Sequence, residues 1–555
     1  MGNKLEYNNG KNNTVTYFLE EYWWLTSIFS GVLITLAFFP FDFWPLIFIS
    51  FVPAFVTLWT LPNFSKWKLF AAGFLTASIP AFFLSSFILT QFHWLPETYL
   101  FIWLVQLGFL PITLLSGCLG GSAFILFQIL RTKNIYTDIF INAVLFVLAE
   151  WIINRIFQGY DFGIIGYTLH QTPLVSLASI GGEHFISFII IFVNTFIVAL
   201  MFGNPFTEAS NTSLFHRERQ KLISFGVIAI AVTAVLYGAN DRYLRQPSAE
   251  KQTMTFAAIQ LQSRKDGAFG SFKNGIFSFP RLEQMLSVVN FQHPDIIIYP
   301  FSPFIGMLSA GNIKDSLHQQ ENIDGTEKQF GEWTAKYIRP KSTFITWNNV
   351  VRNRTVFNEF NYWRQGTMIT HYQKRLLFPL IDYTPTFLQK IGFYTTSFDV
   401  TPGDDEQLIF LNGERVGNLL CSEVSSAAIA RSEAREAPFF LSIGSEAMFN
   451  DDTAGKYDVI KAQFRATENN RPVIRANRLG PSALIDANGN VLTIMNYGKE
   501  GVFLGTLWYE KNPKRTIYNY IGDWGIIPSM GAILLIATAF KKAKRFKLKL
   551  PEILM

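Results

Sequence analysis

The stretch FISFIIIFVNTFIVALMF, from Phe185 to Phe202, decides the fold class because it is long, apolar and without charged residues. A helix needs about 20 predominantly apolar residues to cross the hydrocarbon core of a bilayer. Other runs of this kind precede residue 240 or close the chain: Trp24 to Phe39, Phe43 to Trp59, Leu69 to Phe92, Leu100 to Leu130, Ile139 to Phe157, Ile223 to Tyr237 and Trp524 to Phe540. They predict a polytopic α-helical membrane domain, with seven spanning helices before a long insertion and an eighth after it. The run from Leu100 is long enough to be tilted or broken near Gly117 to Gly121. Core helices of a soluble protein are the alternative, which run length and flanking charge disfavour.

The composition agrees with a membrane protein that carries one soluble insertion. Hydrophobic residues make up 49% of the 555 residues and charged residues only 16%, against about 25% charged in ordinary soluble proteins. The deficit falls in the first 240 residues, whereas residues 250–510 have mixed polarity. A net charge of +6 could suggest nucleic acid, but the basic residues gather beside the apolar runs and in the last fifteen positions. We therefore expect a membrane and no nucleic acid as the partner.

Lysine and arginine positions predict the orientation, because cytoplasmic loops near helix ends carry the excess positive charge. The tail KKAKRFKLKLPE, residues 541–552, is the strongest marker. The loops with Lys66 and Lys68, with Arg131 and Lys133, and with Arg217, Arg219 and Lys221 belong on the same side, and Arg155 is the exception. We expect domains at 1–241 (membrane, seven spans), 242–515 (periplasmic) and 516–555 (eighth span and basic tail). Both termini would be cytoplasmic, in a bacterial inner membrane, and we find no removable signal peptide.

The insertion has the pattern of a layered α/β domain. Short runs rich in β-branched and aromatic residues, among them TFAAIQLQ, DIIIYPF, STFITWNNVV and PVIRAN, alternate with polar helical stretches such as Tyr457 to Asn470. Strands alternating with helices indicate a buried sheet covered by helices. The string DANGN, residues 486–490, is typical of a hairpin connection.

Cys421 is the candidate nucleophile, because it follows the apolar run VGNLL and reactive side chains of α/β domains lie at strand ends. A lone cysteine is more often a small buried hydrophobe. Glu423 lies two residues on and could modulate thiol ionisation, and Lys374 could stabilise a thiolate or an oxyanion; both could equally be solvated side chains. Arg465 and Glu468 have helical i, i+3 spacing and predict a structural ion pair.

Neither cysteine pattern nor short motif indicates further chemistry. The only other cysteine, Cys118, lies inside an apolar run, so a disulfide framework is not expected. The sequence has no HExxH, no CxxC, no glycine-rich phosphate loop and no histidine cluster. We expect no metal and no cofactor.

Several strings, in order along nearly the whole chain, carry a family resemblance. They are AFFPFDFWPL (37–46), GGEHFISF (181–188), YQKRLLFP (372–379) with DYTP (382–385), TPGDDE (401–406), NLLCSE (418–423), RATENNRPVIRAN (465–477) and SALIDANG (482–489). With the seven-plus-one arrangement of helices, they resemble bacterial apolipoprotein N-acyltransferases, membrane enzymes of the nitrilase (carbon-nitrogen hydrolase) superfamily.

The resemblance implies a nitrilase-like αββα sandwich outside the membrane and a Glu-Lys-Cys triad. Members transfer an acyl chain from a phospholipid to the amine of the diacylglyceryl-cysteine that begins a lipoprotein, through a thioester. By position, Cys421 would be the nucleophile and Lys374 the oxyanion-stabilising lysine. Asp382 and Glu423 match supporting carboxylates, and Ser422 stands where the family favours tyrosine.

The general-base position departs from the family pattern. The string DIIIYPFSPF, residues 295–304, places Phe301 where the family has its glutamate, and phenylalanine cannot accept a proton. The segment GSEAMFNDD, residues 444–452, departs as well. Two hypotheses therefore stay open: a working acyltransferase in which another carboxylate, such as Glu423 or Asp382, activates Cys421, and a pseudoenzyme that binds lipid, lipoprotein or a protein partner without turnover. A nitrilase-type amidase is a third, which the membrane helices disfavour.

Overall fold

A computed structural model of the chain describes residues 13–61, 64–89, 99–132, 134–157, 163–203, 212–246, 250–260, 271–273, 276–300, 320–352, 355–379, 381–390, 392, 399–404, 407–445, 452–525, 527 and 531–532. The described residues of 13–241 and 521–532 form one compact unit, called here the membrane unit. Those of 242–520 form the second, the α/β unit. Each unit is treated by itself.

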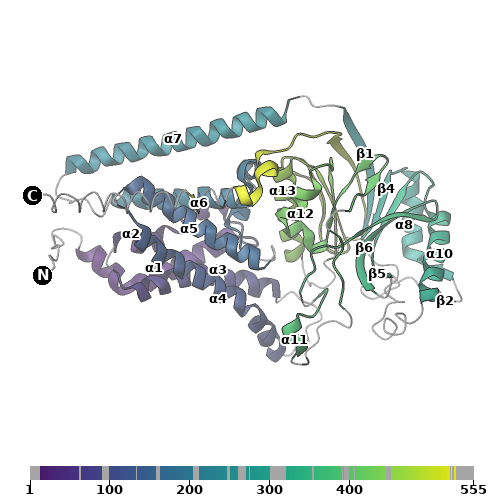
Figure 1. The fold of residues 1–555 in the computed structure, drawn as a ribbon, viewed down its shortest axis with the longest axis horizontal. Helices are drawn as coiled ribbons and strands as arrows, with labels where there is room; N and C mark the ends of the chain where they lie inside the picture. The colour runs from purple at the N-terminus through teal and green to yellow at the C-terminus, as the bar shows by residue number, and fades with distance from the viewer. Residues whose placement is uncertain are drawn as a thin grey trace, which may run out of the picture. The chain divides into compact units, whose positions relative to one another are not determined.

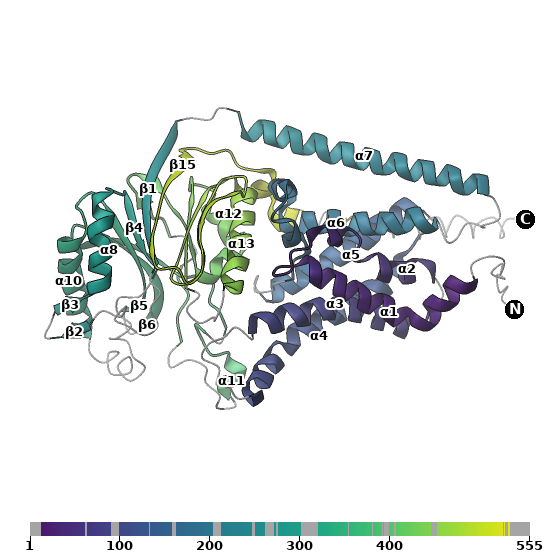
Figure 2. The same ribbon diagram turned by 180° about the vertical axis from the view of Figure 1, so that it is seen from behind.

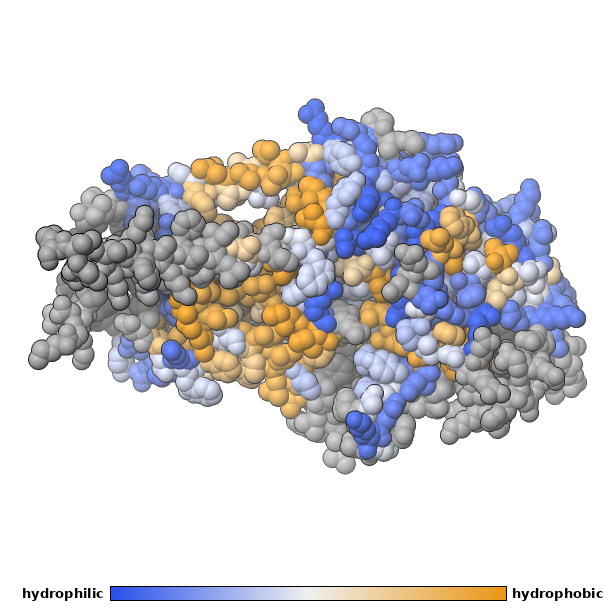
Figure 3. Space-filling view, viewed as in Figure 1, coloured by the Kyte–Doolittle hydropathy of each residue, from blue (hydrophilic) through white to orange (hydrophobic). Residues whose placement is uncertain are grey.

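The membrane unit is helical (Figures 1 and 2). Its elements are α1 (Asn13–Ala37), η1 (Trp44–Phe48), α2 (Val52–Thr60), α3 (Lys66–Leu89), α4 (Tyr99–Leu130), α5 (Ile135–Ile156), η2 (Ile165–Leu169), η3 (Pro173–Leu177), α6 (Ala178–Phe202) and α7, which begins here and runs over Thr212–Leu244. Among the described residues, five helical segments are long and apolar enough to cross a membrane: Lys66–Ser86, Leu110–Leu130, Ile135–Ile156, Pro173–Phe202 and Arg217–Leu244. Exposed apolar side chains gather on the described part of this unit, whereas the face of the α/β unit seen in Figure 3 is mainly hydrophilic. The prediction of a polytopic helical domain is confirmed.

The predicted count of seven spans plus one is not confirmed. The run from Phe43 to Trp59 is not one helix: it forms the short 3-10 helix η1 and the nine-residue helix α2. Each has a proline as the second residue of its first turn, Pro45 in η1 and Pro53 in α2. Proline lacks the N–H that a continuing helix would need, so it stands at a helix start and interrupts the run. Most of the run from Trp524 to Phe540 lies outside the described residues.

Helices α3 and α4 approach closely at their glycines. A Cβ built on Gly121 would lie 2.6 Å from the backbone oxygen of Phe70, and one on Gly117 would lie 2.6 Å from the Phe74 ring. Small residues let the backbones of membrane helices come this near. Of the two alternatives for the fourth run, tilted or broken near these glycines, the break is wrong, because α4 is continuous there and the glycines serve packing.

The α/β unit contains two larger sheets. The six-stranded sheet has the order β15-β1-β4-β5-β6-β7, and the five-stranded sheet β10-β11-β12-β13-β14. Their bounds are β1 (Lys251–Gln260), β4 (Ile296–Tyr299), β5 (Thr343–Arg352), β6 (Thr355–Arg364), β7 (Thr367–Gln373), β10 (Gly417–Leu420), β11 (Phe440–Gly444), β12 (Val473–Asn477), β13 (Ser482–Ile485), β14 (Val491–Met495) and β15 (Gly501–Glu510). Strands β1, β4 and β5 are parallel, as are β10, β11 and β12. Two short pairs, β2 (Ser271–Lys273) with β3 (Ile276–Ser278) and β8 (Phe410–Leu411) with β9 (Glu414–Arg415), are separate.

Three apolar clusters show the layering of this unit. One joins the two sheets, with Ile298 and Phe360 from the first and Leu441 and Ile474 from the second. A second lies between the first sheet and the helices α8 (Pro280–Phe291) and α10 (Gln320–Tyr337). The third lies between the second sheet and the helices α12 (Ala427–Glu433) and α13 (Thr453–Asn469). The layers therefore run helix, sheet, sheet, helix, as the nitrilase-like prediction requires.

Local predictions in this unit also hold. The DANGN string connects the antiparallel strands β13 and β14, and Gly489 has φ 84°, which glycine adopts without strain. Arg465 and Glu468 form the predicted ion pair inside α13, with 3.0 Å between Nε and Oε2, and both are fully buried. A short helix, α11 (Thr386–Lys390), and the 3-10 helix η4 (Cys421–Ser425) complete the unit.

Candidate active site

Cys421 lies where β10 ends and η4 begins. Its φ is 52°, a left-handed conformation that is uncommon and costly for a residue with a Cβ. Its side chain is partly buried and packs against the apolar cluster between the sheets. A strained residue at the end of a parallel strand is typical of sites where the fold presents a reactive side chain.

Lys374 lies just past β7 and is buried, with 2% of its surface exposed. Its Nζ is 2.5 Å from Oδ2 of Asp382, which also accepts the backbone N–H of Phe378 at 2.6 Å. The backbone of Lys374 is held on both sides, donating to the Asn358 oxygen at 2.8 Å and accepting from the Gly403 N–H at 2.9 Å. A buried lysine needs such a carboxylate partner to keep its charge. The sequence-predicted residues Lys374 and Asp382 are thus brought together.

Glu423 connects the segment around Lys374 with the turn of Cys421. Its fully buried carboxylate accepts four hydrogen bonds. Oε1 takes the N–H groups of Arg375 at 2.6 Å and Leu376 at 3.3 Å, and Oε2 takes the Leu420 N–H at 2.8 Å and the Tyr372 hydroxyl at 2.9 Å. Burial raises the pKa of Glu423, although these donors oppose the rise. The carboxylate therefore fixes the Lys374 segment against the residue before Cys421.

Ser422 makes a second connection of the same kind. Its hydroxyl donates to the backbone oxygen of Leu376 at 3.2 Å. At the other end of η4, the Ser425 hydroxyl accepts a hydrogen bond from Nζ of the buried Lys461 at 2.8 Å. The short helix that begins with Cys421 is therefore held at both ends by side chains.

A buried network beside Glu423 was not predicted from the sequence. Arg375 donates from Nε to the Tyr372 hydroxyl at 3.1 Å and from a terminal nitrogen to Glu433 Oε1 at 2.6 Å. Burial raises the pKa of Glu433 and that of Tyr372. Arg375 follows Lys374 directly, which was the one signal available in the sequence, whereas Glu433 lies 58 residues away.

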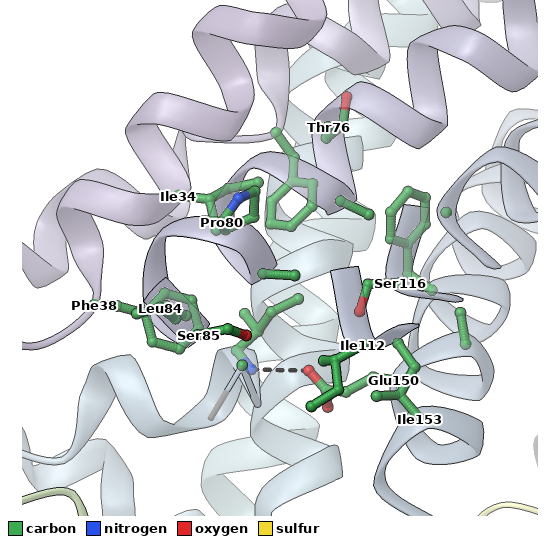
Figure 4. A pocket seen from close by; sticks show the side chains of 18 residues that line it. Ile34, Phe38, Thr76, Pro80, Leu84, Ser85, Ile112, Ser116, Glu150 and Ile153 are labelled. Carbon is green, nitrogen blue, oxygen red and sulfur yellow. Dashed lines mark hydrogen bonds between the residues drawn. The ribbon is translucent and has the colours of Figure 1, made fainter. Parts of the chain in front are cut away.

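The membrane unit has a cavity of its own, with about 790 Å³ of empty space including its open part. Its walls are mainly apolar, and Glu150 is the charged residue among them (Figure 4). The residues labelled in the figure are Ile34, Phe38, Thr76, Pro80, Leu84, Ser85, Ile112, Ser116, Glu150 and Ile153. Such a lining suits an apolar ligand with few polar groups.

Two carboxylates of this unit, Glu150 and Glu183, bind the segment of the short 3-10 helix η2. Glu150 accepts the Ile165 N–H at 2.8 Å and lies 2.9 Å from Nδ1 of His184, and Glu183 accepts the Tyr167 hydroxyl at 2.7 Å. Irregular backbone among membrane helices is tolerated only where such partners satisfy it. The string GGEHFISF thus supplies partners for the loop of η2 and η3.

Comparisons with known proteins agree with this architecture. The family model described as apolipoprotein N-acyltransferase N-terminal domain matches residues 30–196, and the model described as carbon-nitrogen hydrolase matches residues 348–510. Proteins named apolipoprotein N-acyltransferase match over most of their length. That of Bradyrhizobium diazoefficiens is 23% identical over 94% of this chain and 95% of its own, and that of Rhizobium rhizogenes 25% identical over 92% and 95%. The chain belongs to the apolipoprotein N-acyltransferase family.

A relative named apolipoprotein N-acyltransferase 1, from Treponema denticola, is 22% identical over 72% of this chain and 76% of its own. Among solved structures, an amidase of the nitrilase superfamily from Nesterenkonia AN1 is 15% identical, with a TM-score of 0.34, and covers 46% of this chain and 90% of that one.

Within the apolipoprotein N-acyltransferase family pattern, the structure describes part of the candidate triad. Cys421 and Lys374 lie in segments that Glu423 and Ser422 join directly. The position of the family's general base, Phe301, lies outside the described residues, as does most of the segment 444–452.

Proposed function

We propose that this chain transfers an acyl chain from a membrane phospholipid to the N-terminal amine of a lipoprotein diacylglyceryl-cysteine, through a thioester on Cys421. Family membership and the mainly apolar cavity of the membrane unit support a lipid substrate. The observation that carries the proposal is the strained Cys421 turn, tied by Glu423 to the segment of the buried Lys374.

The reaction balances in two steps. The Cys421 thiolate attacks the ester carbonyl carbon of the phospholipid, the ester C–O bond breaks, and the lysophospholipid alkoxide that leaves takes a proton from water to become a hydroxyl. The lipoprotein amine then attacks the thioester, forming an amide and returning the thiol. In each step Lys374 stabilises the negative oxygen of the tetrahedral intermediate, and Asp382 keeps the lysine charged and in place.

With phenylalanine at the family's base position, we propose that no dedicated base takes the thiol proton. Both carboxylates suggested as substitutes already accept hydrogen bonds: Glu423 from four donors, and Asp382 from Lys374 and the Phe378 N–H. A lysine ammonium close to a thiol favours thiolate over thiol, and we propose that Lys374 has this effect on Cys421. The thiol would then ionise to solvent before the attack, and the rate of thioester formation would rise with pH until the thiol is ionised.

The test is to trap the thioester. Purified full chain incubated with a phospholipid carrying a labelled acyl chain should acquire hydroxylamine-sensitive label, and Cys421→Ala should abolish it. Cys118→Ala, which removes the cysteine of α4, is the matched control and should label normally. Absence of label in the wild type, together with failure to support a host lacking its own acyltransferase, would favour the alternative of a pseudoenzyme, to which Phe301 points.

We also propose the domain limits and orientation expected from the sequence. Residues 242–515 would form a periplasmic domain between membrane regions 1–241 and 516–555, with both termini cytoplasmic in the inner membrane of a bacterium. The basic loops and tail support this. Green fluorescent protein fused to either terminus should fluoresce, because it folds in the cytoplasm; a dark fusion at one terminus would contradict the orientation.

A further inference from the structure

A basic pocket lies between α7 and the first turn of α5, within the membrane unit. Its empty space is about 830 Å³, including the part open to solvent. It is lined by Tyr136 of α5 and by Arg217, Gln220, Lys221, Ser224, Phe225 and Ile228 of α7. None of these residues belongs to the site around Cys421 or to the cavity beside Glu150.

The lining changes from charged to apolar along one stripe of α7. Arg217, Lys221, Ser224 and Ile228 follow at intervals of four, three and four residues, which places them on one helix face. At 1.5 Å per residue, the stripe is about 16 Å long. Charged groups come first, then a hydroxyl, then an exposed isoleucine. This is the order of phosphate, glycerol region and acyl chain in a phospholipid.

Packed aromatic side chains form the apolar wall of the pocket. The ring of Tyr136 meets that of Phe225 edge to face, with 4.9 Å between centroids, and Phe225 also lies 6.0 Å from Phe192 of α6. The side chain of Asn134 caps α5 by accepting the Tyr136 N–H at 3.0 Å, which fixes the position of that turn. The apolar part of the pocket is therefore shaped by packed side chains.

The charge of the lining is positive. Arg217 and Lys221 are both exposed, and no acidic residue is in the lining. Glu218 lies three residues before Lys221 on α7, but it is not among the residues that line the pocket. The acid in the first turn of α5, Asp138, is buried and lies 3.4 Å from Arg131. Two cations thus stand without a competing carboxylate among the residues that line the pocket.

The surroundings favour a lipid over a soluble anion. In the apolar span Arg217–Leu244, only 11% of the residues are buried, so α7 presents most of its surface outward. In Figure 3 this helix changes from a hydrophilic end to an apolar stretch. Basic pockets between membrane helices bind lipid headgroups in this way.

We propose that this pocket binds an anionic phospholipid of the bilayer, with its phosphate against Arg217 and Lys221, its glycerol region at Ser224 and Tyr136, and an acyl chain along Phe225 and Ile228. The bound lipid is not the acyl donor but a separate ligand of the membrane unit, and the proposal does not depend on the proposed function.

The test measures lipid binding to delipidated full chain by native mass spectrometry, with phosphatidylglycerol, phosphatidylcholine and soluble glycerol 3-phosphate as probes. We expect tight binding of phosphatidylglycerol alone. The double variant Arg217→Gln with Lys221→Gln should weaken it about 25-fold, since each basic residue near a membrane contributes roughly fivefold to binding an anionic lipid. The matched control removes the same charge at the exposed Lys66 and Lys68 of α3 and should bind as the wild type does.

Two further measurements keep the test decisive if the double variant does not fold. The exchange Arg217→Lys with Lys221→Arg should retain binding, and wild-type binding of phosphatidylglycerol should weaken as salt is raised. Equal binding of both phospholipids, an equal loss in the Lys66 and Lys68 control, or equal competition by glycerol 3-phosphate would overturn the proposal in favour of nonspecific adsorption or a soluble phosphate ligand.

Discussion

Replacing Glu423 by glutamine tests whether this carboxylate holds the candidate site together. Glutamine has the same size, but one of its two acceptor oxygens becomes an NH₂ donor. In the structure each oxygen of Glu423 accepts two hydrogen bonds, from Arg375 and Leu376 on one side and from Leu420 and Tyr372 on the other. Whichever way the amide turns, two donors lose their acceptor and face another donor.

The expected cost follows from that count. A hydrogen bond to a charged group contributes about 1.5 to 3 kcal/mol, so two lost bonds amount to about 3 to 6 kcal/mol. Burial already disfavours the ionised form of Glu423, as its raised pKa shows. Removing the charge therefore recovers part of the free-energy cost of burying it. We expect a net loss of about 2 to 4 kcal/mol. If this free energy is lost from the transition state, because Cys421 and Lys374 are no longer aligned, thioester formation slows about 30- to 1,000-fold.

The assay follows thioester formation on the purified full chain, normalised to folded protein, together with thermal unfolding. Glu436→Gln is the matched control, because this exposed carboxylate pairs with Arg415 at 2.6 Å and surface pairs contribute about 0 to 1 kcal/mol. It should change neither readout appreciably. Wild-type stability and wild-type labelling in Glu423→Gln would refute the idea that the carboxylate ties the two segments together.

Three further predictions concern other contacts. Lys374→Met leaves the buried Asp382 without its cation and should cost about 3 to 5 kcal/mol and abolish labelling; adding Asp382→Asn should recover stability but not labelling, and recovered labelling would remove Lys374 from the mechanism. Because burial raises the pKa of Glu433 from its ordinary 4.5, its stabilising contribution is present below that pH and is lost as pH rises through the folded-state pKa. Unfolding temperatures from about pH 4 to 8 should therefore fall for the wild type relative to Glu433→Gln, and parallel curves would contradict the shift. Gly121→Leu should lower the unfolding temperature, since its Cβ would lie 2.6 Å from the Phe70 oxygen, whereas Gly238→Leu on α7, whose Cβ meets nothing within 4 Å, should not; equal effects would show that the close approach of α3 and α4 is not needed.

Sequence patterns predicted the elements whose residues must meet a single requirement, such as being apolar. A bilayer demands long apolar helices, and a buried parallel strand demands apolar side chains on both faces, so α6 and the strand IIIY of β4 were readable. The prediction of one spanning helix from Phe43 to Trp59 failed. The run is as apolar as a span, but Pro45 and Pro53 divide it into two short helices. Hydropathy averages over a window and does not register a missing N–H.

The hairpin of β6 and β7 escaped prediction for a different reason. Glu359 and Asn361 make β6 look partly polar, yet both are buried. Arg352 of β5 binds the Glu359 carboxylate through two nitrogens, at 2.9 and 3.1 Å, and Asn361 donates to it at 3.1 Å. A buried charge is acceptable once its partners are in place, but the cation that pairs with Glu359 comes from another strand, β5, and no pattern within β6 predicts it.

The same limit applies to the candidate site. Cys421, Lys374 and Glu423 were named first from their residue types and positions beside predicted strands, and Asp382 from the family resemblance, whose strings contain all four. The roles of these residues stay predictions. The network of Tyr372, Arg375 and Glu433 was missed, because the string YQKRLLFP does not show that its members Tyr372 and Arg375 contact Glu433, which lies far along the chain and in none of the family strings.

The pairing of β1 with β15 has a mechanical consequence for the α/β unit. The two strands are antiparallel, and Lys251 at the start of β1 faces Glu510 at the end of β15. The start of β1 and the end of β15 therefore lie about one strand spacing apart, roughly 5 Å. A force that pulled these two residues apart would break the hydrogen-bonded pairs of the two strands one after another, starting at Lys251 and Glu510. Tension applied at these two strand ends is thus resisted by single pairs of hydrogen bonds, and single-molecule pulling from residues 250 and 511 should detach β15 from β1 at low force, before the other strands of either sheet separate.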